Sequence, residues 1–456
     1  MVPITLLKLV ENNSFLSTLS SLYHGNGFEL YLVGGAVRDG ILDIPTNDFD
    51  FTTNATPEES IELLKKNNYK TTEVGKAFGT IELYDQERVV HITTFRKDTY
   101  ETDSRNPEIE KASDLVTDLS RRDFTINSIA YSLETNELID PFSGLKDLAS
   151  GTISTPDDPI ISFSDDPLRM LRVCRFASTH GFSPDNETYI AMKENIERIK
   201  IITKERIRDE INKLLVGKNP SMGIRTLVES GLSLYIIPEI NELKIEVDPK
   251  HHHKDVYEHT LAVYGVSPKL TLRMGALLHD IAKPNTKGIE NGKVHFRHHE
   301  VVGARMTKKI LKGLKYDNKT IEDIALLVEQ HLRPHTFKMG WTDSAVRRYI
   351  VDAGHMLEDL NELVRADVTT KNKIKAKEIY ENLDEMEKRI EEVKAKEELS
   401  KIRPALSGDE IMEHFNIQPG PKVGVIMKAL YEQRINDGEV SKEDALKLAE
   451  ETYKNL

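Results

Sequence analysis

The feature of this sequence that most limits its possible folds is the uneven distribution of strand-like and helix-like segments. Between residues 29 and 95, short runs rich in β-branched and aromatic residues alternate with helical ones. From about Ser164 onward, apolar residues recur at spacings of three and four, which predicts helices almost throughout. The chain is therefore expected to hold one α+β domain followed by helical domains. The clearest predicted elements of the first region are strands at ELYLVGG (29–35), TIELY (80–84) and RVVHITTF (88–95), and a helix over 56–67 that opens on Thr56 and Pro57.

The size of the chain allows two to four domains, since domains commonly contain ~100–200 residues and this chain has 456. Hydrophobic residues make up 39% and charged residues 30%, a balance typical of soluble globular proteins. No apolar run approaches the ~18–20 residues of a membrane span, so no membrane partner is expected. The N-terminal stretch MVPITLLKLVENNSF lacks a basic region, and we interpret it as a first helix and not as a signal peptide.

The cysteine content bears on the cellular compartment, and the net charge bears on how the protein could bind a nucleic acid. Cys174 is the only cysteine, which makes an intramolecular disulfide impossible and fits a reducing, cytoplasmic location. The net charge is −13, so the global field of the chain repels phosphate groups. A nucleic-acid partner would have to meet Lys and Arg side chains that are concentrated locally.

The stretch LVGGAVRDGILDIPTNDFDFTT, residues 32–53, combines a glycine turn, an arginine and two alternate acids. If DFDFTT forms a strand, Asp48 and Asp50 point to one face while the intervening phenylalanines face the core. Adjacent carboxylates repel unless a cation lies between them, and a pair of Mg²⁺ ions is the usual solution in phosphoryl transfer. Gly34 and Gly35 let backbone N–H groups approach an anion, and Arg38 offers a planar fork for phosphate. These parts suit the binding and cleavage of a nucleoside triphosphate.

Further motifs favour this interpretation over a mere glycine turn followed by an acidic surface strand. GGAVRD…DFD, RRDFTIN (121–127) and DDPLRMLRVCRF (165–176) resemble successive motifs of the class II tRNA nucleotidyltransferases, the CCA-adding enzymes, which bacterial poly(A) polymerases share. The resemblance extends from about Leu32 to Glu210, and a weaker similarity to the same enzymes occurs near the C-terminus. It implies a head related to polymerase β that transfers nucleotides with Mg²⁺.

The resemblance also implies roles for individual residues. In the family, the D-x-D pair holds the catalytic metals, which here means Asp48 and Asp50. Other motif positions contact the nucleotide, with Arg122 at phosphate and Asp123 at the ribose hydroxyl. The implied nucleotide-binding set is Gly34, Gly35, Arg38, Arg122, Asp123, Asn127, Asp166, Arg169, Arg172 and Arg175.

Asp166 and Arg169 are the residues that the resemblance assigns to reading the base. At positions i and i+3 they would share a helix face. The carboxylate only accepts and the guanidinium only donates, so the pair matches the amino group and ring nitrogen of cytosine or adenine. Guanine and uracil present the reverse and would leave buried mismatches of about 1–3 kcal/mol each. Taken alone, the pair would be interpreted as a surface salt bridge. Asp165 replaces the family's glutamate, from which we expect little effect.

Two features of the head leave alternatives open. Polymerases of this superfamily often have a third acid, but the candidate strand carries His91, and Glu82 lies on a neighbouring strand, so the sequence does not identify one.

The polar segment 94–115, TFRKDTYETDSRNPEIEKASDL, matches a loop that lets the family's pocket switch from C to A. Its length favours complete CCA addition over CC addition, the alternative being a merely variable surface loop.

A histidine-rich helical region is predicted over 255–370. Imidazole and carboxylate are good ligands for borderline divalent metals. The order H…HD…H…H…D resembles the HD-superfamily phosphohydrolases and implies Mn²⁺, Ni²⁺ or Mg²⁺ as the ion, and phosphatase or 2′,3′-cyclic phosphodiesterase activity. Structural histidines without metal are the alternative. The implied ligands are His259, His279, Asp280, His299, His331 and Asp367, with Lys283 at a trailing basic position and His253 as a neighbour.

The predicted architecture is multidomain. An α+β, polymerase-β-like nucleotidyltransferase head (1–150) precedes an all-α neck (151–247), an HD-domain helical bundle (248–372) and a helical tail (373–456). Mixed charges over 371–399 predict an exposed helix in the tail. The rest of the tail resembles the C-terminal segment of the same enzymes and would hold the tRNA elbow. Its candidate phosphate contacts are Lys401, Arg403 and Lys422, for which solvated surface is the alternative.

The resemblance therefore implies an enzyme that adds C, C and A to the 3′ end of tRNA from CTP and ATP without a nucleic-acid template. Alternatives are a poly(A) polymerase, a CC-adding enzyme with a separate A-adding partner, and a protein whose main activity is that of the HD domain. Oligomeric state and the metal and substrate of the HD domain are left undetermined.

Overall fold

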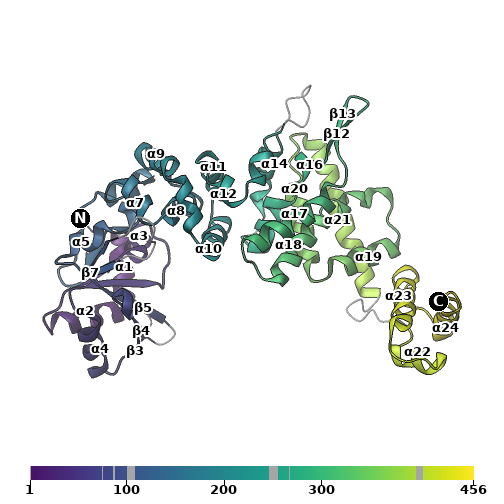
Figure 1. Ribbon diagram of the computed structural model, residues 1–456, viewed down its shortest axis with the longest axis horizontal. Coiled ribbons are helices and arrows are strands. Elements are labelled where there is room, and N and C mark those ends of the chain that lie inside the picture. Colours follow the sequence, from purple (N-terminus) through teal and green to yellow (C-terminus); the bar gives the residue numbers. More distant parts are fainter. Residues whose placement is uncertain are drawn as a thin grey trace. The chain divides into compact units, whose positions relative to one another are not determined.

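The computed structural model describes residues 2–73, 75–85, 88–99, 108–245, 255–266, 268–396 and 404–456. The chain divides into two compact units, Met1–Asn241 and Glu242–Leu456. The first unit holds a mixed sheet and a helical neck, and the second holds a helical bundle and a helical tail (Figure 1). None of the helices in the described part of the chain has the length and hydrophobicity required to cross a bilayer.

A seven-stranded sheet organises the head, with the strand order β3-β4-β5-β2-β1-β8-β9. β2 and β5 run parallel, and every other neighbouring pair is antiparallel. The strands are β1 (Leu30–Val33), β2 (Phe49–Thr53), β3 (Lys70–Thr72), β4 (Thr80–Asp85), β5 (Arg88–Thr94), β8 (Ala130–Ser132) and β9 (Glu137–Ile139). The helices of this part are α1 (Ile4–Glu11), α2 (Ser14–His24), α3 (Gly35–Ile41), α4 (Pro57–Lys66), α5 (Leu115–Ser120) and α6 (Gly144–Ser150).

The predicted strands and first helices of the head are confirmed. α4 begins where the sequence indicates, because Thr56 accepts from the Glu59 N–H while the Glu59 carboxylate accepts from the Thr56 N–H. In β2, Phe49 and Phe51 are 0% and 1% exposed. This alternation fixes the face on which the intervening Asp50 lies.

The neck is built around one central helix, α8, whose apolar side packs on α10 and α11. Gly223 of α11 permits close packing, since a Cβ there would lie 2.7 Å from Ser178 Cβ on α8. The arginines of the DDPLRMLRVCRF motif lie on this central helix, so the neck holds motif residues against the head. The neck helices include α7 (Pro159–Asp165), α8 (Leu168–His180), α9 (Asn186–Glu194), α10 (Lys204–Leu215) and α11 (Pro220–Glu229).

The second unit is a helical bundle that carries a small hairpin. The helix expected to be exposed over 371–399 is present as α21, but one side of it is buried. Leu383, Met386, Ile390 and Val393 recur at helical spacing and enter the bundle core, so the charges cover only the opposite side. The elements are α14 (Val256–Ala262), α15 (Leu270–Leu278), β12 (Lys287–Glu290), β13 (Lys293–Phe296), α17 (His299–Gly313), α18 (Asn318–Gln330), α19 (Asp343–Ala353), α20 (Leu357–Asp367) and α21 (Lys373–Lys396).

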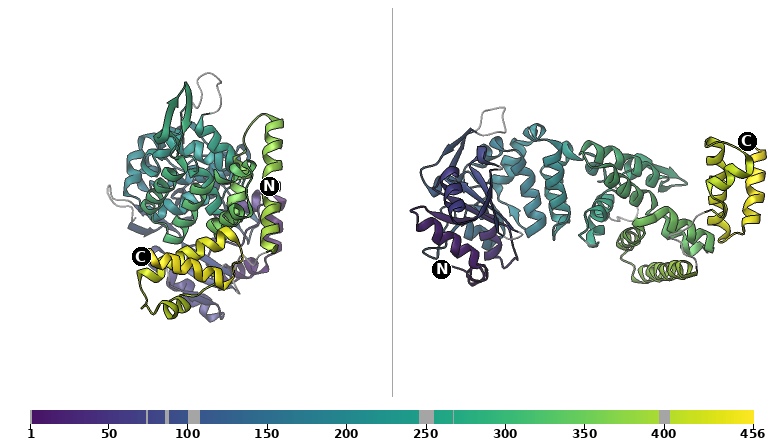
Figure 2. Two further views of the ribbon diagram at one scale, coloured as in Figure 1. Left: turned by 90° about the vertical axis from the view of Figure 1, so that its right-hand side faces the viewer. Right: turned by 90° about the horizontal axis from the view of Figure 1, so that it is seen from below.

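The tail helices α22 (Gly408–Phe415), α23 (Pro421–Asp437) and α24 (Lys442–Lys454) pack on one another around a small core of their own (Figure 2). Arg347 of α19 connects the tail to the bundle. It donates to the carbonyl oxygens of Ile435 and Asn436 at the end of α23, the latter at 3.0 Å. These contacts satisfy carbonyls that the helix end leaves without an intrahelical donor.

Candidate functional site

The two acids of the D-x-D motif lie at the start of β2. Asp48 immediately precedes the strand and Asp50 is its second residue. Ligand atoms of Asp48, Asp50 and His91 lie within 4.8 Å of one another. Burial, and then the charge of Asp50, raise the pKa of the Asp48 carboxyl. Two mutually repelling carboxylates beside an imidazole form a donor set that fits a divalent cation.

The register of the sheet places the residues considered for a third acid. Asp50 pairs with His91 across β2 and β5, and His91 pairs with Glu82 across β5 and β4. His91 Nδ1 lies 3.3 Å from Asp50 Oδ1, and His91 Nε2 lies 4.0 Å from Glu82 Oε1. The hydrogen bond with Asp50 raises the pKa of His91. An imidazole thus occupies the position beside Asp50, and the Glu82 carboxylate lies behind it.

The glycine turn brings the backbone of the first motif close to the other motifs. Gly34 has φ +69°, a conformation that glycine adopts without steric cost. A Cβ on Gly34 would lie 3.2 Å from Arg122 Nη1 and 3.8 Å from Asp50 Oδ2. Next to it, Gly35 begins α3, from which Arg38 donates to Asn127 Oδ1 at 2.6 Å. Residues far apart in the sequence therefore line one small region.

Asp123 is buried among three arginines of α8, namely Arg169, Arg172 and Arg175. Arg172 Nη2 lies 2.5 Å from Asp123 Oδ2, and Asn127 donates to Asp123 Oδ1 at 2.9 Å. Burial opposes charge on Asp123, but Arg172 and the Asn127 hydrogen bond lower its pKa to about 2. Burial and the neighbouring Arg172 lower the pKa of Arg175 to about 10, so positive charge here is crowded. Such crowding is what an added polyphosphate would relieve.

A buried acid that the sequence analysis missed positions two arginines of this region. Asp118 is fully buried, and it accepts from Arg121 at 2.8 Å and from Arg122 at 3.2 Å. It also accepts from Thr52 on β2 at 3.1 Å. The signal in the sequence is the D-x-x-R-R spacing, which places both arginines one helical turn after the acid.

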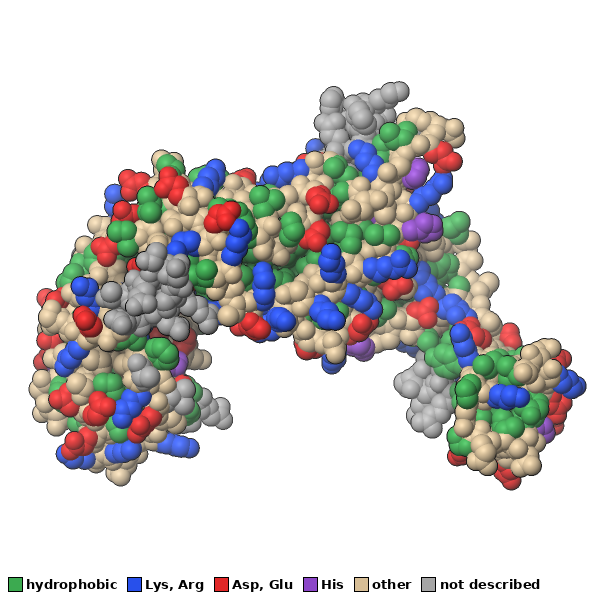
Figure 3. All heavy atoms as spheres, in the orientation of Figure 1, with side chains coloured by type: hydrophobic (Ala, Val, Ile, Leu, Met, Phe, Trp, Pro, Cys, Tyr) green, Lys and Arg blue, Asp and Glu red, His purple; other side chains and the backbone are tan. Residues whose placement is uncertain are grey.

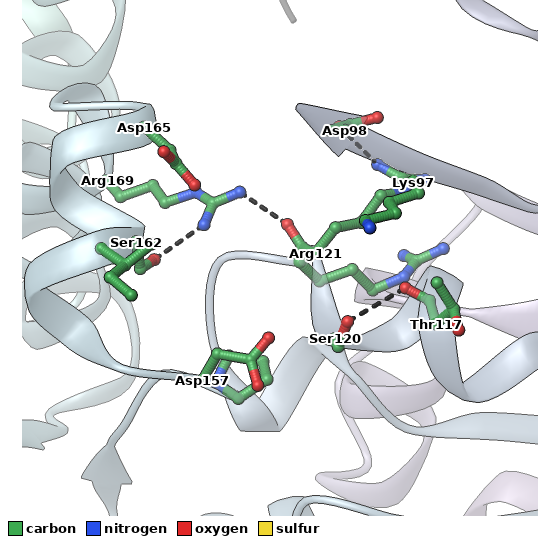
Figure 4. A pocket seen from close by; sticks show the side chains of 12 residues that line it. Lys97, Asp98, Thr117, Ser120, Arg121, Asp157, Ser162, Asp165 and Arg169 are labelled. Carbon is green, nitrogen blue, oxygen red and sulfur yellow. Dashed lines mark hydrogen bonds and ion pairs between the residues drawn. The ribbon is translucent and has the colours of Figure 1, made fainter. Parts of the chain in front are cut away.

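The residues predicted to read the base have partners other than each other. Arg169 donates to Ser162 Oγ at 2.7 Å and to the Arg121 carbonyl at 2.6 Å (Figure 4). Asp166 accepts from the Leu168 N–H at 3.1 Å and from Arg206 at 3.3 Å. The pocket beside Arg169 is lined instead by Asp165, together with Lys97, Asp98, Thr117, Ser120, Arg121, Arg122, Pro156, Asp157, Ile161 and Ser162.

We expect the substitution Asp166→Asn to lower discrimination against UTP by about 10–100-fold, because an amide can donate to the uracil carbonyl where the carboxylate cannot. The matched control is Asp165→Asn, which removes one charge from the adjacent position. Relative incorporation of CTP and UTP, measured for both variants, assigns the role. A larger loss of discrimination in Asp165→Asn would transfer base reading to the acid that lines the pocket.

The polar segment after β5 forms the arms of a two-stranded hairpin, β6 (Arg96–Thr99) and β7 (Glu108–Lys111), with residues 100–107 outside the described chain. Asp98 on the first arm accepts from Arg96 at 3.3 Å and from Arg121 at 3.4 Å. The base of the hairpin therefore lines the pocket beside Arg169, through Lys97 and Asp98.

The six residues predicted as metal ligands of the HD region converge in the second unit. His259 comes from α14, His279 and Asp280 follow α15, His299 begins α17, His331 follows α18, and Asp367 ends α20. Asp280 Oδ2 lies 3.4 Å from His259 Nε2 and 3.3 Å from His279 Nε2, while Oδ1 lies 3.3 Å from His299 Nε2 and 3.9 Å from His331 Nε2. Asp280 thus joins two groups of ligands, one at each carboxylate oxygen.

Main-chain carbonyls fix the orientation of three of these histidines. Nδ1 of His279 lies 2.9 Å from the Ala276 oxygen, Nδ1 of His299 lies 2.8 Å from that of Phe296, and Nδ1 of His331 lies 2.7 Å from that of Val328. A carbonyl only accepts, so each Nδ1 donates a proton to it and each Nε2 is the ring nitrogen that faces the cluster. This is the arrangement in which histidine binds metals.

The ionisable groups of this cluster shift one another's pKa values. Burial opposes charge on Asp280 and Asp367, but the neighbouring histidines hold both pKa values well below the usual range. Burial works against a charged His279, yet Asp280 and Asp367 raise its pKa to about 10. Burial and the charge of His279 lower the pKa of His331 to about 3. A neutral His331 beside a shared carboxylate suits a metal ligand.

One member of the cluster was missed. His335 Nε2 lies 3.7 Å from Asp367 Oδ2. The signal in the sequence is the spacing of four residues in VEQHLRPH, which places His335 one turn after His331.

The predicted RNA contacts of the tail are only partly described. Lys422 is exposed on α23, with its ammonium 5.4 Å from the centre of the Tyr453 ring. Lys401 and Arg403 lie outside the described residues, as does His253. Lys and Arg side chains recur on the visible faces of the neck and, separately, of the helical bundle (Figure 3).

Comparison with protein-family models finds three consecutive matches. Residues 30–154 match the poly A polymerase head domain, residues 181–244 match the probable RNA and SrmB-binding site of polymerase A, and residues 256–368 match the HD domain.

Two curated relatives and one solved structure extend these matches over most of the chain. A CCA-adding enzyme of Anoxybacillus flavithermus is 34% identical over 73% of this chain and 74% of its own. An A-adding tRNA nucleotidyltransferase of Deinococcus radiodurans is 30% identical over 88% of this chain and 91% of its own. The fold is that of the Bacillus stearothermophilus CCA-adding enzyme solved with CTP, at a TM-score of 0.71 and 23% identity over 97% of this chain and 98% of that one.

Proposed function

The chain belongs to the family of class II tRNA nucleotidyltransferases and poly(A) polymerases, and on that basis we propose that it adds C, C and A to the 3′ end of tRNA, using CTP and ATP. Relatives that match over most of the chain include a CCA-adding enzyme and an A-adding tRNA nucleotidyltransferase, two products that an extension assay distinguishes.

The observation that carries the proposal is the meeting of the separate motifs around Gly34. Asp50 and Arg122 both approach this turn, and Arg38 reaches Asn127 from the following helix. A triphosphate needs a metal-binding acid pair, a close backbone and several cations in one place. The head and neck supply all of these from segments that are distant in the sequence.

In the proposed reaction, the 3′ oxygen of the RNA forms a bond to the α-phosphorus of the nucleotide. The bond from that phosphorus to the bridging oxygen breaks, and pyrophosphate leaves. Asp48 and Asp50 would hold the divalent metal, which when bound stabilises the attacking and leaving oxygens. Arg122, Arg172 and Arg175 would balance the charge of the triphosphate. These arginines are paired in turn with Asp118, Asp123 and Glu210.

The test is extension of a tRNA transcript that lacks its 3′ CCA, and of one that ends in CC, with labelled CTP and ATP singly and together. Three nucleotides on the first primer followed by a stop is the expected result. Two nucleotides and a stop would mean CC addition, and extension of the CC primer alone would mean A addition. A long ladder of A on generic RNA would identify a poly(A) polymerase.

A second activity is proposed for the HD domain, carried by the two groups of ligands that share Asp280. Divalent metals held there would suit hydrolysis of a phosphate ester, such as a 2′,3′-cyclic phosphate at an RNA end. Addition of water that breaks the bond from phosphorus to the 3′ oxygen would leave the 3′ hydroxyl that the head extends, with the phosphate retained on the 2′ oxygen. Opening of a 2′,3′-cyclic phosphate substrate with Mn²⁺, Ni²⁺ or Mg²⁺ is the expected result, and no ring opening with any of them would refute this activity.

For the rest of the substrate, we propose that the tail contacts the body of the tRNA, with Lys422 as one phosphate contact. We also propose that the reaction takes place in the cytoplasm. We propose that these roles belong to four domains: the head (1–150), the neck (151–247), the HD domain (248–372) and the tail (373–456).

A further inference from the structure

His91 is the histidine of the head that lies in contact with the D-x-D pair. Its Nδ1 is 3.3 Å from Asp50 Oδ1, and its donor atoms and those of both aspartates fall within 4.8 Å of one another. Two ligand atoms on adjacent positions of an octahedral ion with bonds of ~2.1 Å lie about 3.0 Å apart. The spacing of His91 and Asp50 is therefore close to that of two ligands of one ion.

The Glu82 carboxylate lies on the side of the imidazole that faces away from Asp50. The Glu82 Oε2 atom accepts from Thr72 at 2.9 Å and from Tyr84 at 3.0 Å. Its other oxygen, Oε1, lies 4.0 Å from His91 Nε2. Nδ1 faces Asp50, so it is the nitrogen that would bind an ion shared with that carboxylate. A carboxylate behind a histidine, on the side away from the ion, is a common arrangement in metal sites.

From this geometry, and resting on the proposed nucleotidyl transfer, we propose that His91 is a third ligand of the head's divalent metal, so that the donor set is two carboxylates and one imidazole. Mg²⁺ prefers oxygen ligands, whereas Mn²⁺ accepts nitrogen more readily. A neutral imidazole also gives the site one negative charge fewer than a third carboxylate would. The head should bind Mn²⁺ in preference to Mg²⁺.

The alternative role for His91 is that of a cation that merely neutralises Asp50. The two roles make opposite predictions for the substitution His91→Glu. As a ligand, glutamate restores an oxygen donor and a charge, so Mg²⁺ should bind more tightly and the preference for Mn²⁺ should fall. If His91 is only a counter-ion, glutamate adds repulsion without changing which ion is preferred.

The experiment measures Mn²⁺ binding by electron paramagnetic resonance, with Mg²⁺ as competitor, in the full-length wild type and in His91→Glu. The HD site is the same in both proteins, so any difference in their metal binding arises from the site in the head. We expect the ratio of Mn²⁺ to Mg²⁺ affinity at the head to fall by roughly tenfold or more. Pulsed measurements should show fewer Mn²⁺ ions coupled to nitrogen in the variant. His91→Gln, which removes the imidazole without adding charge, should lose the nitrogen coupling too.

The control is His24→Gln, because His24 is a histidine of the head that pairs instead with Glu134 at 2.8 Å. It should leave both the affinity ratio and the nitrogen coupling unchanged. An unchanged ratio and coupling in His91→Glu would overturn the proposal. Extension of tRNA by the same wild-type preparation separates a failure of the proposed function from a failure of the role of His91. Absence of extension with either ion refutes the proposed function. Extension by the wild type, together with an unchanged affinity ratio in His91→Glu, refutes the role of His91 alone.

Discussion

Replacement of Asp50 by asparagine is expected to slow nucleotide addition by on the order of a thousandfold. A metal at the reacting phosphate contributes several kcal/mol of transition-state stabilisation, and each 1.36 kcal/mol is a factor of about ten in rate. The same substitution should leave the head about as stable as before, because relief of the repulsion between Asp48 and Asp50 offsets the weakened contact with His91. Incorporation of labelled CTP, together with thermal unfolding, measures both effects.

Glu137→Gln is the matched control for Asp50→Asn, since it removes an exposed acid from β9 of the same sheet. Its rate should equal that of the wild type. An Asp50→Asn variant that retains its rate to within about tenfold would contradict the role of the acid pair. A variant that loses both rate and stability would indicate a structural contribution instead.

Replacement of Asp280 by asparagine is expected to have the largest effect on the second unit. Its two oxygens contact both groups of histidines, so one substitution weakens the whole cluster. We expect metal bound by this unit to fall to background after dialysis, since even residues behind the ligands change affinity by about 10–100-fold. Metal content by mass spectrometry and hydrolysis of a 2′,3′-cyclic phosphate are the two measurements.

His298→Gln is the control for this experiment. His298 directly precedes His299, but its side chain is 81% exposed and lies outside the cluster. The control should retain metal and hydrolysis. Retention of both by Asp280→Asn would show that the cluster does not depend on a shared carboxylate, and retention of metal with loss of hydrolysis would assign Asp280 to the reaction itself.

The sequence allowed prediction of those features that local chemistry determines. Phe49 and Phe51 alternate with acids, so the strand and the face of Asp50 follow from spacing alone. Thr56 and Pro57 predicted the start of α4, and the structure adds the reciprocal hydrogen bonds of Thr56 with Glu59. The convergence of the six predicted HD ligands could be expected from their order in the chain, because each is attached to a recognisable motif.

What the sequence left open depends on contacts between distant segments. The pairing of β2 with β5 sets His91 beside Asp50 and Glu82 behind it, and register across a parallel pair cannot be derived from one strand. Asp166 meets Arg206, and Arg169 meets the Arg121 carbonyl, through packing of the neck. The division of the HD ligands between two oxygens of Asp280 likewise arises only when the bundle forms.

The carbonyl contacts of His279, His299 and His331 have a consequence for ion exchange at the proposed metal site of the second unit. Hydrogen bonds to the backbone orient these imidazoles, so their orientation follows from the fold of the bundle. Exchange of one divalent ion for another would then require no refolding, unlike in domains that fold only around their metal. The ion recovered with the protein should reflect which ions surround it and at what concentrations, so occupancy would vary with growth conditions while the fold stays the same.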